Sequence, residues 1–249
     1  MAGYSSFGIS DVDDLLGGGL PPASSYLLEV EPGTEEWAFI SCFLDGGWRQ
    51  QEICIISTYD MPYQELIKRL SEFTDAKRKL DSGVLFIADL WTEAKSDYEL
   101  TGPIFMTSNP SDINNMSQVS FELVKQIPKR LQDGKFKGLR NVTYSLSSMI
   151  MNYKFEPTYK WTKTGLNLSR QSSVTNLTIL NPKMFDETTV AAFEHLNDGI
   201  IVLSMKELGD KFQRYIRIKR SPITGFSTRI VPYDIVDKKP RLLKHSDQS

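Results

Sequence analysis

The chain has 249 residues, of which 40% are hydrophobic and 24% charged, the balance of an ordinary globular protein. Its net charge of -2 offers no overall attraction to nucleic acid or to an anionic membrane, so we expect neither as a partner. No apolar stretch reaches the roughly 20 residues of a membrane span, and the first ten residues lack a signal-peptide pattern. Cys42 and Cys54 lie in apolar runs typical of buried thiols, which leads us to expect a cytoplasmic protein.

Helix and strand patterns alternate along most of the chain. In chain order they predict a short helix within 8–16, a strand at 26–30, a helix at 35–44, a strand at 53–57, a helix at 63–73, a strand at 84–88, a helix at 117–132, strands at 142–146 and 177–180, a helix at 188–196, and strands at 199–204, 214–218 and 228–231. We expect Gly46 and Gly47 to end the second helix. The segments 91–112 and 147–171 give no clear pattern.

This alternation predicts an α/β fold with a mostly parallel sheet and helices on both faces. The last three strands have no helices between them, so we expect a C-terminal antiparallel extension. The prediction is a single domain over residues 1–237 and a polar tail over 238–249.

Several motifs resemble one family. Residues 8–47 read GISDVDDLLGGGLPPASSYLLEVEPGTEEWAFISCFLDGG, and ICIISTYDMPYQELIKRL follows at 53–70. These runs are similar to the N-terminal part of KaiC-like and RadA-like ATPases of the RecA superfamily, which carry a PGTGKT phosphate loop and an ISTE-type strand. LRNVTYSLSSMI resembles their Walker-B strand, which usually ends in DSLS, and HLNDGIIVLSMKELGDKFQRYIRIKRS resembles their late hairpin. The resemblance implies a RecA-like three-layer α/β/α sandwich.

The phosphate loop departs from the family pattern. A working loop surrounds phosphates with backbone N–H groups and supplies a lysine and a magnesium-binding hydroxyl. The resemblance places the degenerate loop on Val30, Pro32, Gly33, Thr34, Glu35, Glu36 and Trp37. Glu35, Glu36 and Trp37 fall where the family has glycine, lysine and threonine. Each carboxylate about 4 Å from a phosphate would repel it by roughly 1 kcal/mol in water, so we expect no useful ATP affinity.

Two further sites agree with a degenerate phosphate loop. Tyr144 stands where the Walker-B aspartate is expected, and a phenol is no magnesium ligand at neutral pH. Tyr59 and Asp60 stand where the family carries catalytic glutamates; we expect Asp60 to cap the turn before Pro62. Thr34 is expected to cap the following helix, with Glu35 and Glu36 in its first turn.

Other features have competing interpretations. By resemblance, either Arg217 and Lys219 or Lys219 and Arg220 match the family's basic pair, which reaches a neighbouring subunit, so these three residues are a candidate subunit interface. The other interpretation is that these basic side chains alternate along a half-exposed strand and simply face solvent. The segment 153–163 mixes aromatic residues with lysines; DNA stacking is one interpretation and packing the favoured one. Apolar residues at 104–106 suggest a partner surface or a return to the core. His195 lacks a partner ligand, so no metal is expected.

We therefore expect a non-catalytic KaiC-like pseudo-ATPase with no cofactor, acting in regulation, signalling or scaffolding. Its partner would be a protein, either a second copy or an active KaiC-like relative, in an oligomer. One alternative is a nucleotide-binding KaiC-like signalling ATPase with a rebuilt site. The other is a RadA-like DNA-binding accessory protein.

Overall fold

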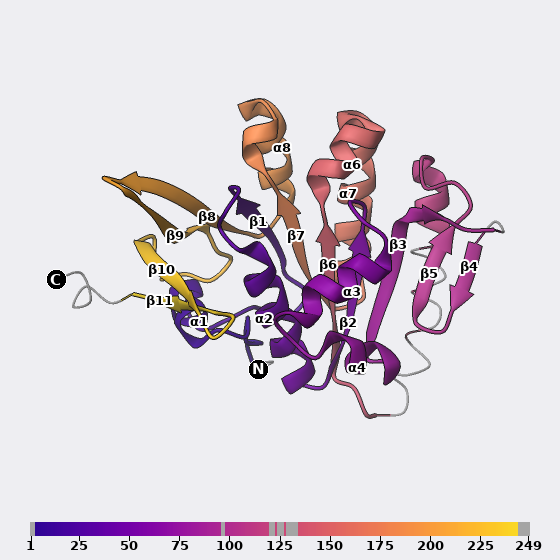
Figure 1. Ribbon diagram of the computed structural model, residues 1–249, viewed down its shortest axis with the longest axis horizontal. Coiled ribbons are helices and arrows are strands. Elements are labelled where there is room, and N and C mark those ends of the chain that lie inside the picture. The colour runs from indigo at the N-terminus through magenta and orange to yellow at the C-terminus, as the bar shows by residue number, and fades with distance from the viewer. Residues whose placement is uncertain (1–2, 96–97, 120–122, 124–126, 128–133, 244–249) are drawn as a thin grey trace.

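The computed structural model describes residues 3–95, 98–119, 123, 127 and 134–243. Figure 1 shows one central sheet with helices on both faces, so the predicted three-layer α/β/α sandwich is confirmed. The strands are β1 (Ser25–Val30), β2 (Glu52–Thr58), β3 (Leu85–Glu93), β4 (Tyr98–Thr101), β5 (Ile104–Thr107), β6 (Gly138–Tyr144), β7 (Val174–Leu180), β8 (Gly199–Leu208), β9 (Lys211–Arg220), β10 (Ile230–Val236) and β11 (Lys239–Leu242). The helices are α1 (Ser10–Leu16), α2 (Glu36–Arg49), α3 (Tyr63–Ser71), α4 (Ala76–Asp81), α6 (Leu146–Tyr153), α7 (Phe155–Gln171) and α8 (Glu187–Leu196), with a 3₁₀ turn at Pro182–Met184.

The strand order is β11-β10-β9-β8-β1-β7-β6-β2-β3-β5-β4. Pairing is parallel from β8 through β1, β7, β6, β2 and β3 to β5. Strands β9, β10 and β11 continue the sheet in antiparallel fashion, and β4 pairs antiparallel with β5 at the other edge. The predicted antiparallel extension is present, but the first of its three strands, β8, also pairs in parallel with β1.

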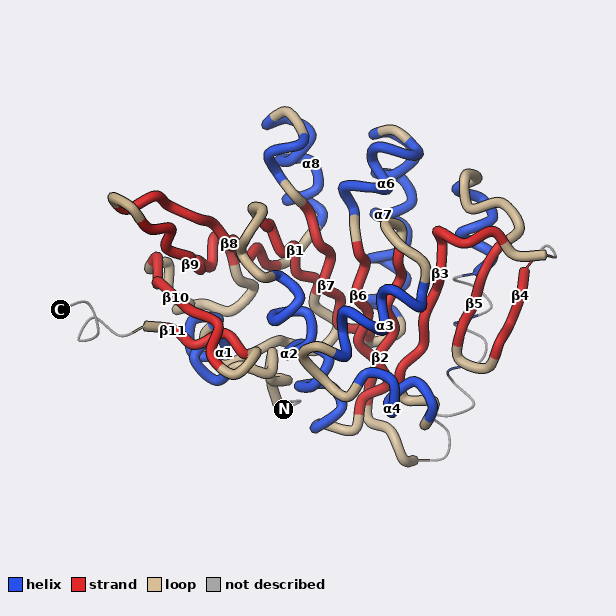
Figure 2. The backbone as a smooth tube through the Cα atoms, viewed as in Figure 1, coloured by secondary structure: helices blue, strands red, loops and turns tan. Residues whose placement is uncertain are grey.

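The two faces of the sheet bury separate apolar clusters. Helices α1, α2, α3 and α4 cover one face, where Phe39, Leu66 and Ile216 are fully buried. Helices α6, α7 and α8 lie on the other face, where Leu146, Met149 and Phe193 are fully buried (Figure 2). The periodicity of the apolar residues predicts these faces because strand side chains alternate between the two sides.

Helix α2 does not end at Gly46 and Gly47, so the predicted stop there is wrong. The helix continues to Arg49. A Cβ on Gly46 would lie 2.8 Å from the carbonyl oxygen of Ser6, and one on Gly47 would lie 2.8 Å from Cδ of Arg140. These glycines therefore allow the N-terminal segment and a buried arginine to approach the helix closely.

Arg140 is the largest fully buried side chain among the described residues. Its guanidinium forms an ion pair with Glu52, donates 2.7 Å to the carbonyl oxygen of Phe43 and donates to the hydroxyl of Ser5. It also lies 4.8 Å from the centre of the Phe43 ring. This network joins β6, β2 and α2 to the N-terminal segment.

Four other segments refine the sequence predictions. Residues 147–171 fall largely in α6 and α7, and residues 104–106 lie buried in β5, so they return to the core. The helix predicted at 117–132 begins earlier, at 113, and its described residues 113–119, 123 and 127 are helical. The predicted polar tail at 238–249 contains a strand, β11, because Lys239–Leu242 pairs with β10 and Pro240 is buried. Residues 244–249 lie outside the described residues.

Within the described part of the chain, no helix is both long and apolar enough to cross a lipid bilayer. Cys42 and Cys54 are buried and unpaired, as expected.

Candidate functional site

The loop between β1 and α2 has a sharply bent backbone. Gly33 has a φ of 87° and Glu35 a φ of 58°, both in the left-handed region. Glu35 is the residue before α2, and no side chain caps the helix there. Thr34 is fully buried and its hydroxyl donates 2.7 Å to the carbonyl oxygen of Glu31. The expectation that Thr34 caps the helix is therefore wrong, because its hydroxyl closes the loop instead.

Strands β8, β9 and β10 hold this loop in place. Arg214 donates 2.8 Å to the carbonyl oxygen of Gly33, and the Tyr233 hydroxyl donates 2.6 Å to that of Thr34. The backbone N–H of Met205 donates 3.0 Å to the carboxylate of Glu31. A loop with this many internal bonds keeps its shape through contacts within the chain.

An aromatic pair lies beside the loop. The rings of Trp37, in α2, and Tyr144, at the end of β6, have centroids 4.3 Å apart and an interplanar angle of 44°. Trp37 is 7% exposed and Tyr144 is 9% exposed. The Tyr144 hydroxyl donates 3.3 Å to the carboxylate of Glu36, which joins two of the predicted degenerate positions directly. Burial, reinforced by the charge of Glu36, raises the pKa of Tyr144 well above its ordinary value, so the phenol stays neutral.

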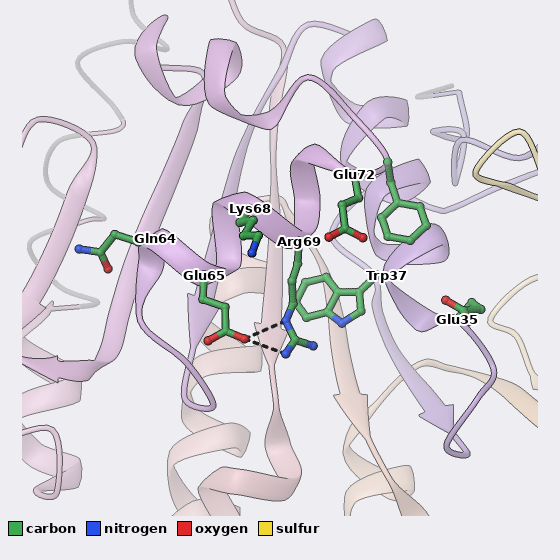
Figure 3. A pocket seen from close by; sticks show the side chains of 8 residues that line it. Glu35, Trp37, Gln64, Glu65, Lys68, Arg69 and Glu72 are labelled. Atoms are coloured by element: carbon green, nitrogen blue, oxygen red, sulfur yellow. Dashed lines mark hydrogen bonds and ion pairs between the residues drawn. The ribbon is translucent and has the colours of Figure 1, made fainter.

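A pocket of about 610 Å³ is lined by Trp37, by Glu35 of the loop and by residues of α3. Figure 3 shows these side chains from close by. The pocket lining includes Trp37, Glu65, Lys68, Arg69 and Phe73. The guanidinium of Arg69 lies 5.9 Å from the centre of the Trp37 ring and donates to Glu65 at 2.7 and 3.2 Å. The pocket thus mixes aromatic, acidic and basic groups, and one of its two cations is already paired.

Tyr59 and Asp60 do not form an acid–base pair. Tyr59 is buried at 1% exposure, and its hydroxyl has no hydrogen-bond partner among the described residues. Asp60 accepts from the hydroxyl of Ser145 at 3.0 and 3.2 Å. The expectation that Asp60 caps the turn before Pro62 is wrong, because Ser145 at the start of α6 takes its carboxylate.

Asp89 instead holds the first residue of α3 and the end of β3, a role that the sequence reasoning missed. Its fully buried carboxylate accepts from the N–H groups of Tyr63, Trp91 and Thr92 at 2.9, 3.1 and 2.8 Å, and from the Thr92 hydroxyl at 2.8 Å. The available signal was an aspartate directly after the apolar run VLFIA. Its saturated bonding makes it a structural group. No cluster of three or more histidine, cysteine, aspartate or glutamate side chains suited to a metal ion occurs among the residues that the structure describes.

Arg217, Lys219 and Arg220, the candidate interface residues, form no hydrogen bond or ion pair with the described loop between β1 and α2. Lys219 forms an ion pair with Glu194, and Arg220 donates to the carbonyl oxygens of Glu194 and Asn197. Arg217 forms no hydrogen bond or ion pair with any described residue. Lys219 and Arg220 therefore hold the C-terminal end of α8 against the sheet.

The aromatic and lysine segment at 153–163 packs, as the favoured interpretation predicted. The rings of Phe155 and Tyr159 lie 5.8 Å from that of Phe193 in α8, centre to centre. Lys160 pairs with Glu156 on the surface of α7. These rings therefore pack α7 against α8.

The mostly parallel sheet between two layers of helices, with an antiparallel extension at its C-terminal end, places the chain in the class of three-layer α/β/α folds. The chain belongs to the KaiC ATPase family, whose family model, described as "ATPase: KaiC", matches residues 5–246.

Similar proteins span nearly the whole chain. A UPF0273 protein of Methanopyrus kandleri is 24% identical over 95% of this chain and 90% of its own, and a UPF0273 protein of Aeropyrum pernix is 25% identical over 93% and 90%. The crystal structure of a KaiC-like protein from Pyrococcus horikoshii superposes with a TM-score of 0.74 at 21% identity, covering 97% of this chain and 99% of that one. At that identity the structural match supports the fold alone.

Proposed function

We propose that this protein is a non-catalytic member of the KaiC family that acts in regulation or signalling by associating with another protein. The contact between Trp37 and Tyr144 carries the proposal. At the positions where the family resemblance expects a magnesium-binding hydroxyl and the Walker-B aspartate, two aromatic rings pack against each other at 4.3 Å.

Electrostatics supports the same conclusion. Glu36 stands at the position of the phosphate-loop lysine and holds the Tyr144 hydroxyl, so a carboxylate replaces the cation that would balance phosphate charge. Glu35 adds a second carboxylate beside the helix start. Together they make the first turn of α2 unfavourable for a triphosphate.

Calorimetric titration of the full chain with ATP at millimolar magnesium tests the proposal. We expect no binding. A micromolar dissociation constant would overturn the proposal directly.

A hydrolysis assay gives a second, independent test. Glu36→Lys is expected to show no turnover above a Glu36→Ala control, because Trp37 and Tyr144 still provide no magnesium ligand. Turnover in the lysine variant alone would contradict this account of the site.

The pocket of Figure 3 supports one other candidate function, a signalling ATPase with a rebuilt nucleotide site. Lys68 is the pocket cation that makes no ion pair with a described residue, and Trp37 offers an aromatic wall. If the ATP titration reports binding, Lys68→Ala should abolish it at this pocket, whereas the matched α4 variant Lys77→Ala should retain it.

A further inference from the structure

One face of the sheet continues past α8 without a covering helix. On strands β8 to β11 the two faces of the sheet differ in exposure near its middle. Leu203, Ile216 and Tyr233, on the face covered by α1 and α2, are fully buried. On the opposite face, Leu208, Ile230 and Val236 are 54%, 49% and 38% exposed. Figure 2 shows α8 as the last described helix on that side, with β9, β10 and β11 extending beyond it.

We call this surface the open face and define it by Lys206, Lys211, Arg217, Ile230, Val236 and Arg241. The strand register places these side chains on one side of the sheet, because Lys206 pairs with Gln213, Lys211 with Leu208, Arg217 with Ile230, Val236 with Lys239 and Arg241 with Asp234. Asp234 is the acidic residue on the same side. In an α/β/α sandwich this is a sheet face that lacks its third layer.

The open face is strongly basic in a chain that is not. By the strand register, six basic residues and one acidic residue of β8 to β11 lie on this side of the sheet: Lys206, Lys211, Arg217, Lys219, Lys239 and Arg241 against Asp234. In the whole chain, 29 lysines and arginines stand against 31 aspartates and glutamates. Lys206, Lys211, Lys239 and Arg241 are exposed on this side of the sheet. The mixture of cations with exposed aliphatic side chains points to a binding surface for an acidic and partly apolar partner.

The covered part of the same face shows what kind of element it accepts. There, α8 lies on the sheet with Glu194 paired to Lys219, and Arg220 donates to the carbonyl oxygens of Glu194 and Asn197 at the end of the helix. A glutamate on a helix thus meets a lysine of the strand, and the negative end of the helix dipole meets an arginine. Apolar contacts through Phe193 complete the packing.

We propose that the open face binds an acidic amphipathic helix of a partner protein, which lies beside α8 and completes the missing layer. The width fits one helix. From β8 to β11 there are three strand spacings, about 14 Å in all, and a helix with its side chains is about 10 to 12 Å across. Glutamates of the partner helix meet Lys211, Arg217 and Arg241, and its apolar side chains cover Ile230 and Val236. This inference rests on the proposed role in protein association.

Single-stranded nucleic acid fits this surface less well. Binding of bases relies on free aromatic rings for stacking. Tyr215 is the one aromatic residue on the described part of the open face, and Lys206 lies 5.3 Å from the centre of its ring. The aliphatic side chains instead match the apolar centre of a protein interface.

The test uses the full chain and a fluorescent amphipathic peptide of about 18 residues, with leucine on one face and glutamate on the other; a companion peptide carries lysine in place of glutamate. Fluorescence anisotropy should show saturable binding of the glutamate peptide, weakened by added salt. Lys211→Glu/Arg241→Glu should weaken it about tenfold or more, since two charge pairs become repulsive. Lys77→Glu/Arg78→Glu, an equal charge change at exposed positions in α4 on the opposite face, should leave it within about twofold. Ile230→Asp should weaken it as well.

Four results would overturn the proposal. Two concern the peptides: equal binding by Lys211→Glu/Arg241→Glu, the face variant, and Lys77→Glu/Arg78→Glu, the α4 variant, or equal binding of the lysine peptide and the glutamate peptide. The other two are tighter salt-dependent binding of a thymidine oligonucleotide than of the glutamate peptide, and a dimer in sedimentation that the face variant alone abolishes. The last two would assign the face to nucleic acid or to a second copy of the chain. ATP titration of the same samples keeps the two proposals distinguishable. Micromolar ATP affinity refutes the non-catalytic function whatever the peptide does, and failure of the peptide alone refutes only the helix-binding face.

Discussion

Reversing the two charges at the start of α2 should destabilise the protein. In the variant Glu35→Lys/Glu36→Lys, position 35 faces Arg214, whose guanidinium lies 3.6 Å from the Glu35 carboxylate. This pair is partly exposed and contributes about 0.2 to 1 kcal/mol. Glu36, in the first turn, interacts with the helix dipole for about 0.3 to 1 kcal/mol and accepts from Tyr144. Lysine removes both contributions and adds repulsion from Arg214 and from the helix end.

The expected loss is therefore roughly 1 to 3 kcal/mol at low salt, with a smaller loss in about 1 M salt, where charges are screened within about 3 Å. For a chain of this length, each kcal/mol corresponds to about 2 to 4 °C in the melting temperature. Thermal melts at the two salt concentrations measure the effect. Glu35→Gln/Glu36→Gln is the matched control and should lose about half as much, because it introduces no repulsion. A lysine variant as stable as wild type in low salt would refute this account of the loop.

Three further predictions concern single residues. Arg140→Met should destabilise by about 3 to 5 kcal/mol in urea unfolding, since it leaves Glu52 and the carbonyl of Phe43 without their buried cation; a loss below about 1 kcal/mol would show that the network is dispensable. Glu35→Gly should be at least as stable as wild type and about 1 to 2 kcal/mol more stable than Glu35→Val, because the left-handed backbone at φ 58° disfavours a Cβ; the reverse order would contradict the loop geometry. Burial and the neighbouring Glu194 raise the pKa of Glu29, and the positive charges of Lys219 and Arg217 reduce this rise. Glu29 therefore stabilises the fold most at a pH below the ordinary glutamate pKa, and this stabilisation is lost as the pH rises through the raised pKa. The stability of Glu29→Gln relative to wild type should therefore increase from about pH 6 to about pH 9, and a constant difference would argue against a raised pKa.

The sequence predicted the sheet and the relation between distant motifs better than it predicted local contacts. Alternating apolar runs located most strands because burial imposes their period. The motif order placed Trp37 and Tyr144 in one site although they are far apart in the chain. It could not show that their rings touch, because that depends on the packing of β6 against α2.

Local errors arose where tertiary contacts overrode a residue's usual preference. Gly46 and Gly47 lie inside a helix, where the lack of a side chain leaves room for Ser6 and Arg140. The neighbouring sequence gives no sign of these tertiary contacts. Thr34 has the type of a helix cap, yet its hydroxyl closes the preceding loop. The role of Asp89 depends on the proximity of the ends of β2 and β3, which only the fold provides.

The burial of Trp37 has a consequence for reversibility. Glu35 is exposed and Glu36 is half-buried, so changing them to glycine and lysine would leave no cavity in the core. Threonine at position 37, in contrast, would remove an indole that is 7% exposed and stacked on Tyr144. Replacing a large buried aromatic residue by a small one costs about 3 to 5 kcal/mol, a large fraction of the about 5 to 15 kcal/mol that holds a domain folded. Under the proposed function, a change of Trp37 back to a magnesium-binding residue would therefore cost stability before it restored any ligand, and this cost would oppose a return of hydrolysis.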